Sequence, residues 1–209
     1  MKRTTTTRRA RLLGPVLFVV AGLLGVAAAF WNWTPSPTPG GLGAAGAPFT
    51  LIDVNGVAFE SRALHGRPQA IFFGYTHCPD VCPTALLDIS QALKTIGAAG
   101  DELAVIFISV DPGRDTPDVM KRYVEAVDPR IIGLTGPEAD IARVAGSFRV
   151  FYRQLPGEGG AYAVDHSAVT YLIGRDGRLV NGLMPGDPQE AIVAKLRKLL
   201  AQAGPARGS

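Results

Sequence analysis

The hydrophobic positions of residues 49–202 follow two spacings, which together predict alternating strands and helices. Apolar residues three or four apart, such as Leu86, Ile89 and Leu93, are typical of one face of a helix. The continuous apolar run 103–110 is instead typical of a strand covered on both faces. We expect strands at 49–54, 57–60, 70–75, 103–110, 169–173 and 179–183, and helices at 83–96, 117–127, 137–148 and 187–202.

Two short polar segments mark hairpins within this order. Asn55-Gly56 is a strong two-residue turn signal, and residues 174–177 separate the last two strands. Between the hairpins, strand, helix, strand and helix predict right-handed crossovers and a parallel core. The fold class is therefore α/β, a mixed central sheet flanked by helices with an antiparallel edge, in one domain at 48–204.

An apolar segment at 12–33 precedes this domain. As a helix it would be about 33 Å long, enough to cross a hydrocarbon core of about 30 Å. Basic residues come before it, and Trp31 and Trp33 end it, as in an anchor whose N-terminus is cytoplasmic. We expect a basic cytoplasmic tail at 1–11 and a single transmembrane helix at 12–33. The domain would then lie on the periplasmic side of a bacterial inner membrane.

Other targeting signals share parts of this pattern. The small residues 27–29 offer a signal-peptidase site, Arg8-Arg9 a twin-arginine signal, and the arginines and threonines a mitochondrial presequence. The length of the apolar run favours a retained anchor. Every alternative places the domain across a membrane.

The charge of the chain is concentrated at its N-terminus. The net charge is +3, and the basic residues before the apolar segment are Lys2, Arg3, Arg8, Arg9 and Arg11. The remainder is therefore slightly acidic, which argues against a nucleic-acid partner. Residues 34–47, rich in proline and then glycine, are interpreted as a linker that holds the domain away from the membrane.

The two cysteines, Cys78 and Cys82, lie four residues apart where a strand is expected to end and a helix to begin. Residues four apart share one helix face, so the thiols can converge on each other, as a disulfide, or on a soft metal ion. The N–H groups and dipole of a helix start favour thiolates. Two buried apolar side chains are the alternative. A dithiol at this strand-to-helix turn is the thioredoxin-like arrangement.

His166 is the candidate third ligand, because the segment before the last hairpin packs against the dithiol in a thioredoxin-like fold. Two thiolates and an imidazole suit copper, and zinc is the competing metal. Asp165 is expected to orient the imidazole through its other ring nitrogen. The alternative for His166 is a hydrogen-bonded loop histidine. His65 is interpreted as solvated, and His77 as tuning Cys78 or lying at the rim of the site.

Three segments make the chain similar to a known family. They read GYTHCPDVCPT at 74–84, VDPGRDTP at 110–117 and VDHS at 164–167. In combination they resemble the Sco/SenC family, membrane-anchored copper proteins of thioredoxin fold that assist assembly of cytochrome c oxidase. The resemblance implies that Cys78, Cys82 and His166 bind one copper ion, as copper(I) or copper(II). The implied partners are a copper-accepting oxidase subunit and a copper donor or thiol reductase.

The expected function is thus a metallochaperone rather than an enzyme, and a thiol–disulfide oxidoreductase is the main alternative. Against the enzyme, the spacing is C-x₃-C, and residues 165–168 lack the cis-proline that thioredoxin-like enzymes normally place there. One dithiol could also serve both roles. A thiol peroxidase using Thr76, Arg114 and a resolving Cys82 would leave His166 without a role.

A polar loop follows the strand at 103–110. Its residues Asp111, Arg114, Asp115 and Thr116 are expected to form a docking surface beside the copper or, in part, the capped start of a helix. Met184, a soft ligand by residue type, is interpreted as a packing residue.

Overall fold

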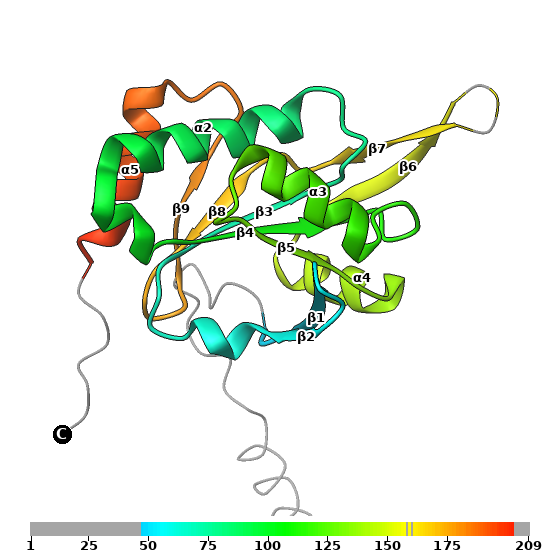
Figure 1. The fold of residues 1–209 in the computed structure, drawn as a ribbon, viewed down its shortest axis with the longest axis horizontal. Coiled ribbons are helices and arrows are strands. Elements are labelled where there is room, and N and C mark those ends of the chain that lie inside the picture. The colour runs from blue at the N-terminus through cyan, green and yellow to red at the C-terminus, as the bar shows by residue number, and fades with distance from the viewer. Residues whose placement is uncertain (1–46, 158, 160, 203–209) are drawn as a thin grey trace, which may run out of the picture. The chain divides into compact units, whose positions relative to one another are not determined.

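The structure is a computed structural model that describes residues 47–157, 159 and 161–202 (Figure 1). The expected tail at 1–11, the anchor at 12–33 and nearly all of the linker at 34–47 lie outside these residues and remain predictions. Within the described part of the chain, no helix has the length and apolar character needed to span a membrane.

A seven-stranded sheet in the order β2-β1-β5-β4-β3-β8-β9 forms the centre of the domain. The three middle strands, β5, β4 and β3, run parallel, and the neighbours on both sides pair with them antiparallel. The expected mixed sheet is thereby confirmed. Its strands are β1 (Thr50–Asp53), β2 (Ala58–Glu60), β3 (Gln69–Gly74), β4 (Ala104–Ser109), β5 (Ile132–Thr135), β8 (Thr170–Ile173) and β9 (Leu179–Leu183).

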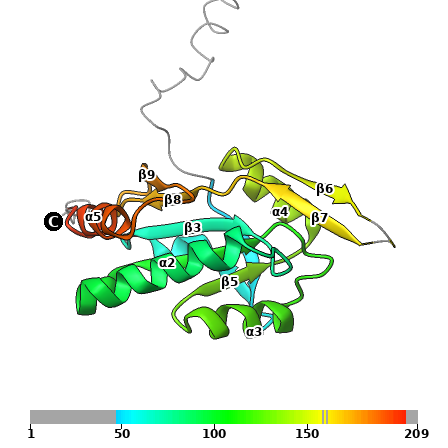
Figure 2. The same cartoon turned by 90° about the horizontal axis from the view of Figure 1, so that it is seen from above.

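The described residues form four α-helices and two short 3₁₀ helices around the sheet. Helices α2 and α3 cover one face, as expected for two successive right-handed crossovers, whereas α4 lies on the other face (Figure 2). Helix α5 packs against α2 and β9. The helices are α2 (Val81–Ile96), α3 (Pro117–Val127), α4 (Glu138–Ser147), α5 (Gln189–Leu200), η1 (Ser61–Leu64) and η2 (Gly97–Glu102).

The core is centred on β3 and β4. Every residue of β4 is buried, which confirms the strand covered on both faces that its apolar run predicts. Phe72 of β3 and Phe107 of β4 are fully buried, and their rings stack with centroids 6.0 Å apart. The carboxyl ends of these two strands lead into the cysteine loop and the polar loop, so the core holds both loops at one edge of the sheet.

The structure contains strands that the sequence pattern did not predict. Strand β5 has four residues, one of them Gly133, and is too short to give a clear signal. Strands β6 (Tyr152–Pro156) and β7 (Tyr162–His166) pair only with each other and form a hairpin that projects from the body (Figure 1). Most of their side chains are exposed, so the hairpin lacks the apolar run of a core strand.

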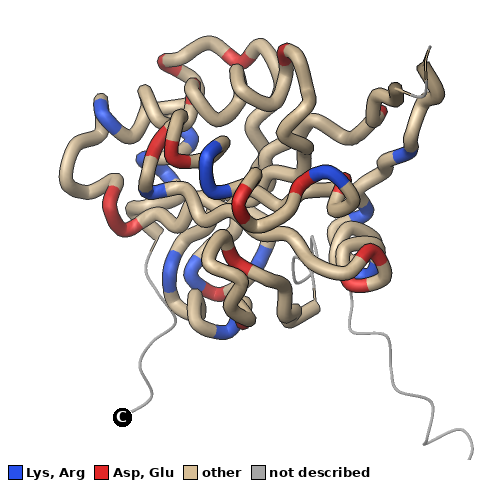
Figure 3. Tube along the Cα trace, turned by 45° about the vertical axis from the view of Figure 1, so that its right-hand side comes forward, with Lys and Arg blue, Asp and Glu red and all other residues tan. Residues whose placement is uncertain are grey.

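Charged residues of both signs are interspersed over the described part of the chain (Figure 3). Several of them pair locally, such as Arg143 with Asp140 and Lys195 with Asp187.

Asp128, buried at the end of α3, connects two helices and a turn. Its carboxylate accepts hydrogen bonds from Ser90 Oγ on α2 at 2.7 Å and from Arg130 Nη2 at 2.7 Å. The Arg130 guanidinium, with help from Ser90, holds the pKa of Asp128 well below its ordinary range. A carboxyl group of this kind stabilises the fold above its unfolded pKa, and the stabilisation is lost as the pH falls through its folded pKa.

We therefore expect Asp128→Asn to lower the free energy of unfolding at neutral pH by about 1–2 kcal/mol, because charge-assisted hydrogen bonds are lost. The difference from wild type should shrink below about pH 4, where the wild-type carboxyl group begins to lose its advantage. Urea denaturation at several pH values measures both effects. Asp140→Asn, at an exposed ion pair on α4, is the control and should change little. A difference that does not vary with pH would contradict the assignment.

Candidate metal centre

The two cysteines lie at the junction of β3 and α2. Helix α2 begins at Val81, two residues before the expected start, so Cys82 belongs to its first turn. Cys78 lies in the preceding loop, not on the helix, and the expected one-turn spacing on a shared face is wrong. The thiols converge because the free backbone N–H of Cys82 donates to Cys78 Sγ at 3.4 Å. Both are free cysteines and both are buried, Cys82 completely.

Gly74, the last residue of β3, makes room for the sulfur of Cys82. A β-carbon placed on Gly74 would lie 2.7 Å from Cys82 Sγ and 2.9 Å from the Phe107 ring. The pattern of residues does not reveal this role of Gly74. The one signal is its position as the first residue of the segment 74–84, because the contact with Cys82 forms only when the loop folds back on the strand end.

His166 ends strand β7. Along this strand Tyr162, Val164 and His166 are partly or fully buried, whereas Ala163 and Asp165 are exposed, as the alternation of a strand requires. His166 Nε2 lies 3.3 Å from Cys82 Sγ. The structure thus brings together all three residues proposed from the sequence: Cys78 Sγ, Cys82 Sγ and one ring nitrogen of His166 lie within 4.8 Å of one another.

The other ring nitrogen of His166 faces the backbone. Nδ1 lies 3.1 Å from the carbonyl oxygen of Ser167, which places the Nδ1 proton there and leaves Nε2 as the free ligand atom. The expected role of Asp165 is therefore wrong. Its side chain points to the opposite face of β7, where it pairs with Arg153 at 3.5 Å. The His166 ring also makes an edge-on contact with the Tyr75 ring, with the two centroids 5.8 Å apart, and this contact restricts rotation of the imidazole.

Burial determines the protonation of the donor atoms. It raises the pKa of the Cys82 thiol far above its ordinary value, and the neighbouring Cys78 raises it further. It lowers the pKa of His166, so the imidazole is neutral near pH 7. Cys82 and His166 therefore offer a protonated thiol beside a neutral imidazole. A metal ion that binds there replaces the thiol proton with its own positive charge.

The cysteine loop is held by the buried carboxyl group of Asp115. Asp115 accepts hydrogen bonds from the Thr76 backbone N–H at 3.0 Å, from Thr76 Oγ1 at 2.6 Å and from Ser109 Oγ at 2.6 Å. Asp111 is buried as well. The expected docking surface at 111–116 is thus wrong for these two carboxyl groups, which face inward. Thr116 precedes α3 without a side-chain cap.

The remaining candidates lie apart from the three donors. His77, next to Cys78, is half exposed and points its Nδ1 to Thr76 Oγ1 at 3.1 Å. His65 is exposed. The guanidinium of Arg114 binds Asp111 and the carbonyl of Tyr162 instead of a cysteine, which removes the arrangement that a thiol peroxidase would use.

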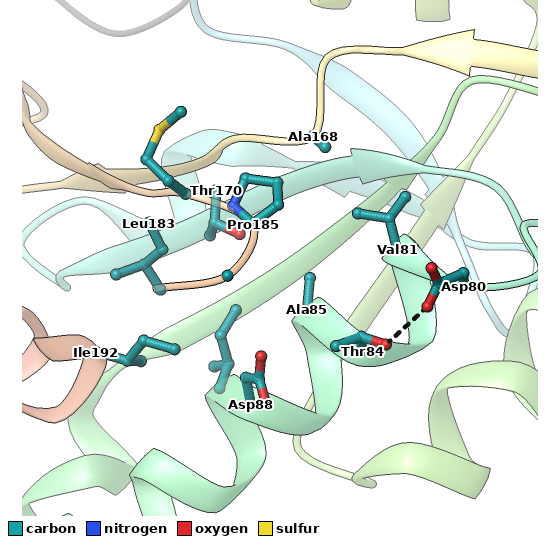
Figure 4. A pocket seen from close by; sticks show the side chains of 13 residues that line it. Asp80, Val81, Thr84, Ala85, Asp88, Ala168, Thr170, Leu183, Pro185 and Ile192 are labelled. Atoms are coloured by element: carbon teal, nitrogen blue, oxygen red, sulfur yellow. Dashed lines mark hydrogen bonds between the residues drawn. The ribbon is translucent and has the colours of Figure 1, made fainter. Parts of the chain in front are cut away.

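A pocket of about 190 Å³ opens beside the cysteines, between the start of α2 and the segment that joins β9 to α5 (Figure 4). Val81 and Ala168 line its end nearest the site, but none of the three donor residues does. The candidate metal position is therefore defined by converging donor atoms and not by this pocket. Met184, interpreted from the sequence as a packing residue, lies at the pocket and is 53% exposed.

The donor set determines which metals suit the site. Two sulfur atoms and one imidazole nitrogen favour copper or zinc over hard cations such as Mg²⁺ or Ca²⁺. With three protein donors, one coordination position is left for an incoming ligand. Such a site can bind a soft metal and exchange it.

Enlarging Gly74 should disturb the position of Cys82. We expect Gly74→Ala to destabilise the fold by about 1–3 kcal/mol, because the added carbon overlaps Cys82 Sγ, and to weaken metal binding with it. Thermal unfolding and copper titration measure the two effects. Gly113→Ala is the matched control, since a β-carbon there meets nothing within 4 Å. Equal stability of both variants would show that the close contact is unimportant.

Copper(I) binding should also depend on pH. Because the pKa of Cys82 is raised, its thiol is protonated at neutral pH, and the metal must displace that proton. The logarithm of the binding constant should therefore rise by about one or more per pH unit between about pH 6 and pH 8. Competition titrations at fixed copper measure this slope. A binding constant independent of pH would mean that Cys82 does not ligate the metal.

The comparisons with known proteins agree with this geometry. The SCO1/SenC family model matches residues 38–201. The SCO2-like protein of Rickettsia prowazekii is 43% identical over 135 residues, which cover 64% of this chain and 66% of the relative. The match therefore spans just under two thirds of that relative's length.

Solved structures show the same similarity. ScoI of Bradyrhizobium japonicum with copper bound is 47% identical, covering 75% of this chain and 99% of that one, with a TM-score of 0.69. ScoI of Arabidopsis thaliana with copper bound is 36% identical, covering 77% and 100%, with a TM-score of 0.72. These structures share the mixed sheet flanked by helices, as the thioredoxin-like fold requires. With the family model matching most of its length, this chain belongs to the SCO1/SenC family.

Proposed function

We propose that the chain is a copper metallochaperone that binds one copper ion through Cys78, Cys82 and His166. The observation that carries the proposal is the convergence of two sulfur atoms and Nε2 of a neutral imidazole within 4.8 Å. Relatives solved with copper bound support copper over zinc as the metal. In the cell, the ion would pass to the binuclear copper site of cytochrome c oxidase during its assembly, as the family resemblance implies.

Ligand exchange is the chemistry that this role requires. Copper(I) is held well by two thiolates, whereas copper(II) gains more from an imidazole. With three protein donors, a thiolate or imidazole of the oxidase subunit can enter the open position before the donors leave. The segment 12–33 would anchor the protein in a bacterial inner membrane, with the domain on the periplasmic side beside its partners.

Thiol–disulfide exchange with partner cysteines is the second candidate, because the same two free thiols lie close together at a helix start. Their burial opposes it. An attacking thiol needs exposure and a lowered pKa, but Cys78 is 8% exposed, and Cys82 is fully buried with a raised pKa.

An anaerobic copper titration of the reduced protein tests the proposal. We expect one copper(I) per chain, with affinity lowered about 100-fold or more in Cys78→Ser and Cys82→Ser, since loss of an outer contact alone costs about 10–100-fold. His166→Ala should weaken copper(II) binding more than copper(I) binding.

His77→Ala is the matched control, because His77 adjoins Cys78 but contacts Thr76 Oγ1 and is not one of the three converging donors. It should leave both affinities unchanged. If no stoichiometric copper binds and the two cysteines instead cycle readily through a disulfide, the chaperone role fails and the oxidoreductase remains.

A further inference from the structure

Strand β7 carries His166 at one end and is fixed by Arg114 at the other. Arg114 Nη1 donates to the carbonyl oxygen of Tyr162, the first residue of β7, at 3.0 Å. The guanidinium carbon lies 3.7 Å from the centroid of the Tyr162 ring, a close cation–π contact. Arg114 thus holds both the backbone and the side chain of the residue that begins the strand.

Asp111 completes this clamp from the polar loop. Arg114 Nε donates to Asp111 Oδ2, and the Tyr162 hydroxyl donates to Asp111 Oδ1 at 2.7 Å. Asp111 is 1% exposed, so its carboxyl group depends on these two donors. The three side chains form a closed triangle of two hydrogen bonds and one ring contact between the β4–α3 loop and the projecting hairpin.

The clamp reaches the imidazole by two routes. The first is the strand itself: Tyr162, Val164 and His166 face inward together, so a shift or twist at Tyr162 moves His166. The second is the Tyr75 ring, which lies 5.7 Å from the Arg114 guanidinium carbon on one side and 5.8 Å from the His166 ring on the other.

Besides this clamp, the hairpin meets the body through side-chain packing: Val164 is buried in the core, and Tyr152 packs against it. Strands β6 and β7 pair with each other and with no strand of the main sheet. The other ion pair near its base joins Arg153 to Asp165, both on the hairpin and both exposed, so it cannot fix the hairpin to the domain. At the far end of β7, the Ser167 N–H donates to the Phe151 carbonyl, which is again a bond within the hairpin segment.

We propose that Arg114, held by Asp111, is a positioning residue that fixes β7 so that His166 reaches Cys82 and can ligate copper(II). The proposal rests on the proposed copper site and adds to it the residue that sets the third ligand. Copper(I), which relies mainly on the two thiolates of the cysteine loop, is affected far less. Arg114 thereby influences which oxidation state of copper the site prefers without touching the metal.

The test compares Arg114→Leu with wild type in the full-length chain. We expect copper(II) affinity to fall about tenfold, in line with other outer contacts of metal ligands, and the imidazole nitrogen coupling in paramagnetic resonance to weaken. Copper(I) affinity should stay within about threefold. Arg114→Lys, which keeps the cation but not the planar fork, should restore the signal in part.

A second readout needs no copper. In the metal-free protein, amide hydrogen exchange of residues 162–166 should accelerate in Arg114→Leu, while exchange in β3 and β4 should not. Arg153→Leu is the matched control, an arginine on the same hairpin whose charge, among the described residues, pairs with Asp165 and lies near the Phe151 ring; it should leave every readout unchanged.

Removing Arg114 alone leaves the buried Asp111 carboxyl group without its cation and could prevent folding. The double variant Arg114→Leu with Asp111→Asn removes both charges and keeps an acceptor for the Tyr162 hydroxyl, so it should show the same loss of imidazole coupling in a folded protein. Unchanged copper(II) spectra together with unchanged hairpin exchange would overturn the proposal. If the wild-type protein shows no imidazole coupling, His166 does not ligate copper(II), and the proposed copper site is wrong. Hydrogen exchange of the metal-free protein still tests separately whether Arg114 fixes β7.

Discussion

The buried carboxyl groups of a single loop hold the two halves of the metal centre in place. A buried polar group must be satisfied within the protein, and here the partners come from other segments of the chain. Asp115 takes its hydrogen bonds from Thr76 and so fixes the cysteine loop. Asp111, four residues earlier, binds Arg114 and Tyr162 and so fixes the strand that carries His166. The core strands β3 and β4 in turn hold the loop itself.

This arrangement separates the donors from the residues that position them. In the metal-free protein, burial disfavours both the thiolate of Cys82, whose pKa is raised, and the charged form of His166, whose pKa is lowered. The charged side chains Asp111, Arg114 and Asp115 contact the segments that carry the donor atoms, not the donor atoms themselves. A buried, protonated thiol is a poor nucleophile, but it can still bind a soft metal ion that displaces its proton. These properties support a binding role over thiol catalysis.

Sequence patterns located the strongly apolar elements correctly and missed those whose stability comes from pairing. The continuous apolar run 103–110 predicts a strand covered on both faces, and every residue of β4 is buried in the structure. The hairpin of β6 and β7 has mostly exposed residues and is stabilised by cross-strand pairing and by the Arg114 clamp. Neither contribution is visible in local hydrophobicity. For the same reason, local hydrophobicity does not reveal the inward alternation of β7, which places Asp165 on the face opposite His166, although the two are neighbours in the chain.

The sequence by itself determined the donor chemistry: two cysteines four residues apart at a strand end, a distant histidine, and an alternating order of elements that brings them to one edge of a sheet. Residue type and spacing are local properties, and they suffice to suggest a soft metal. Only the tertiary structure decided how the donors are held. Three features show this: the gap at Gly74 that admits Cys82 Sγ, the carbonyl of Ser167 that orients His166, and the inward turn of Asp111 and Asp115. Each depends on how the chain bends and on which way a strand or loop faces. Such contacts arise from packing across the sheet edge, and no local pattern of hydrophobic and polar residues records them.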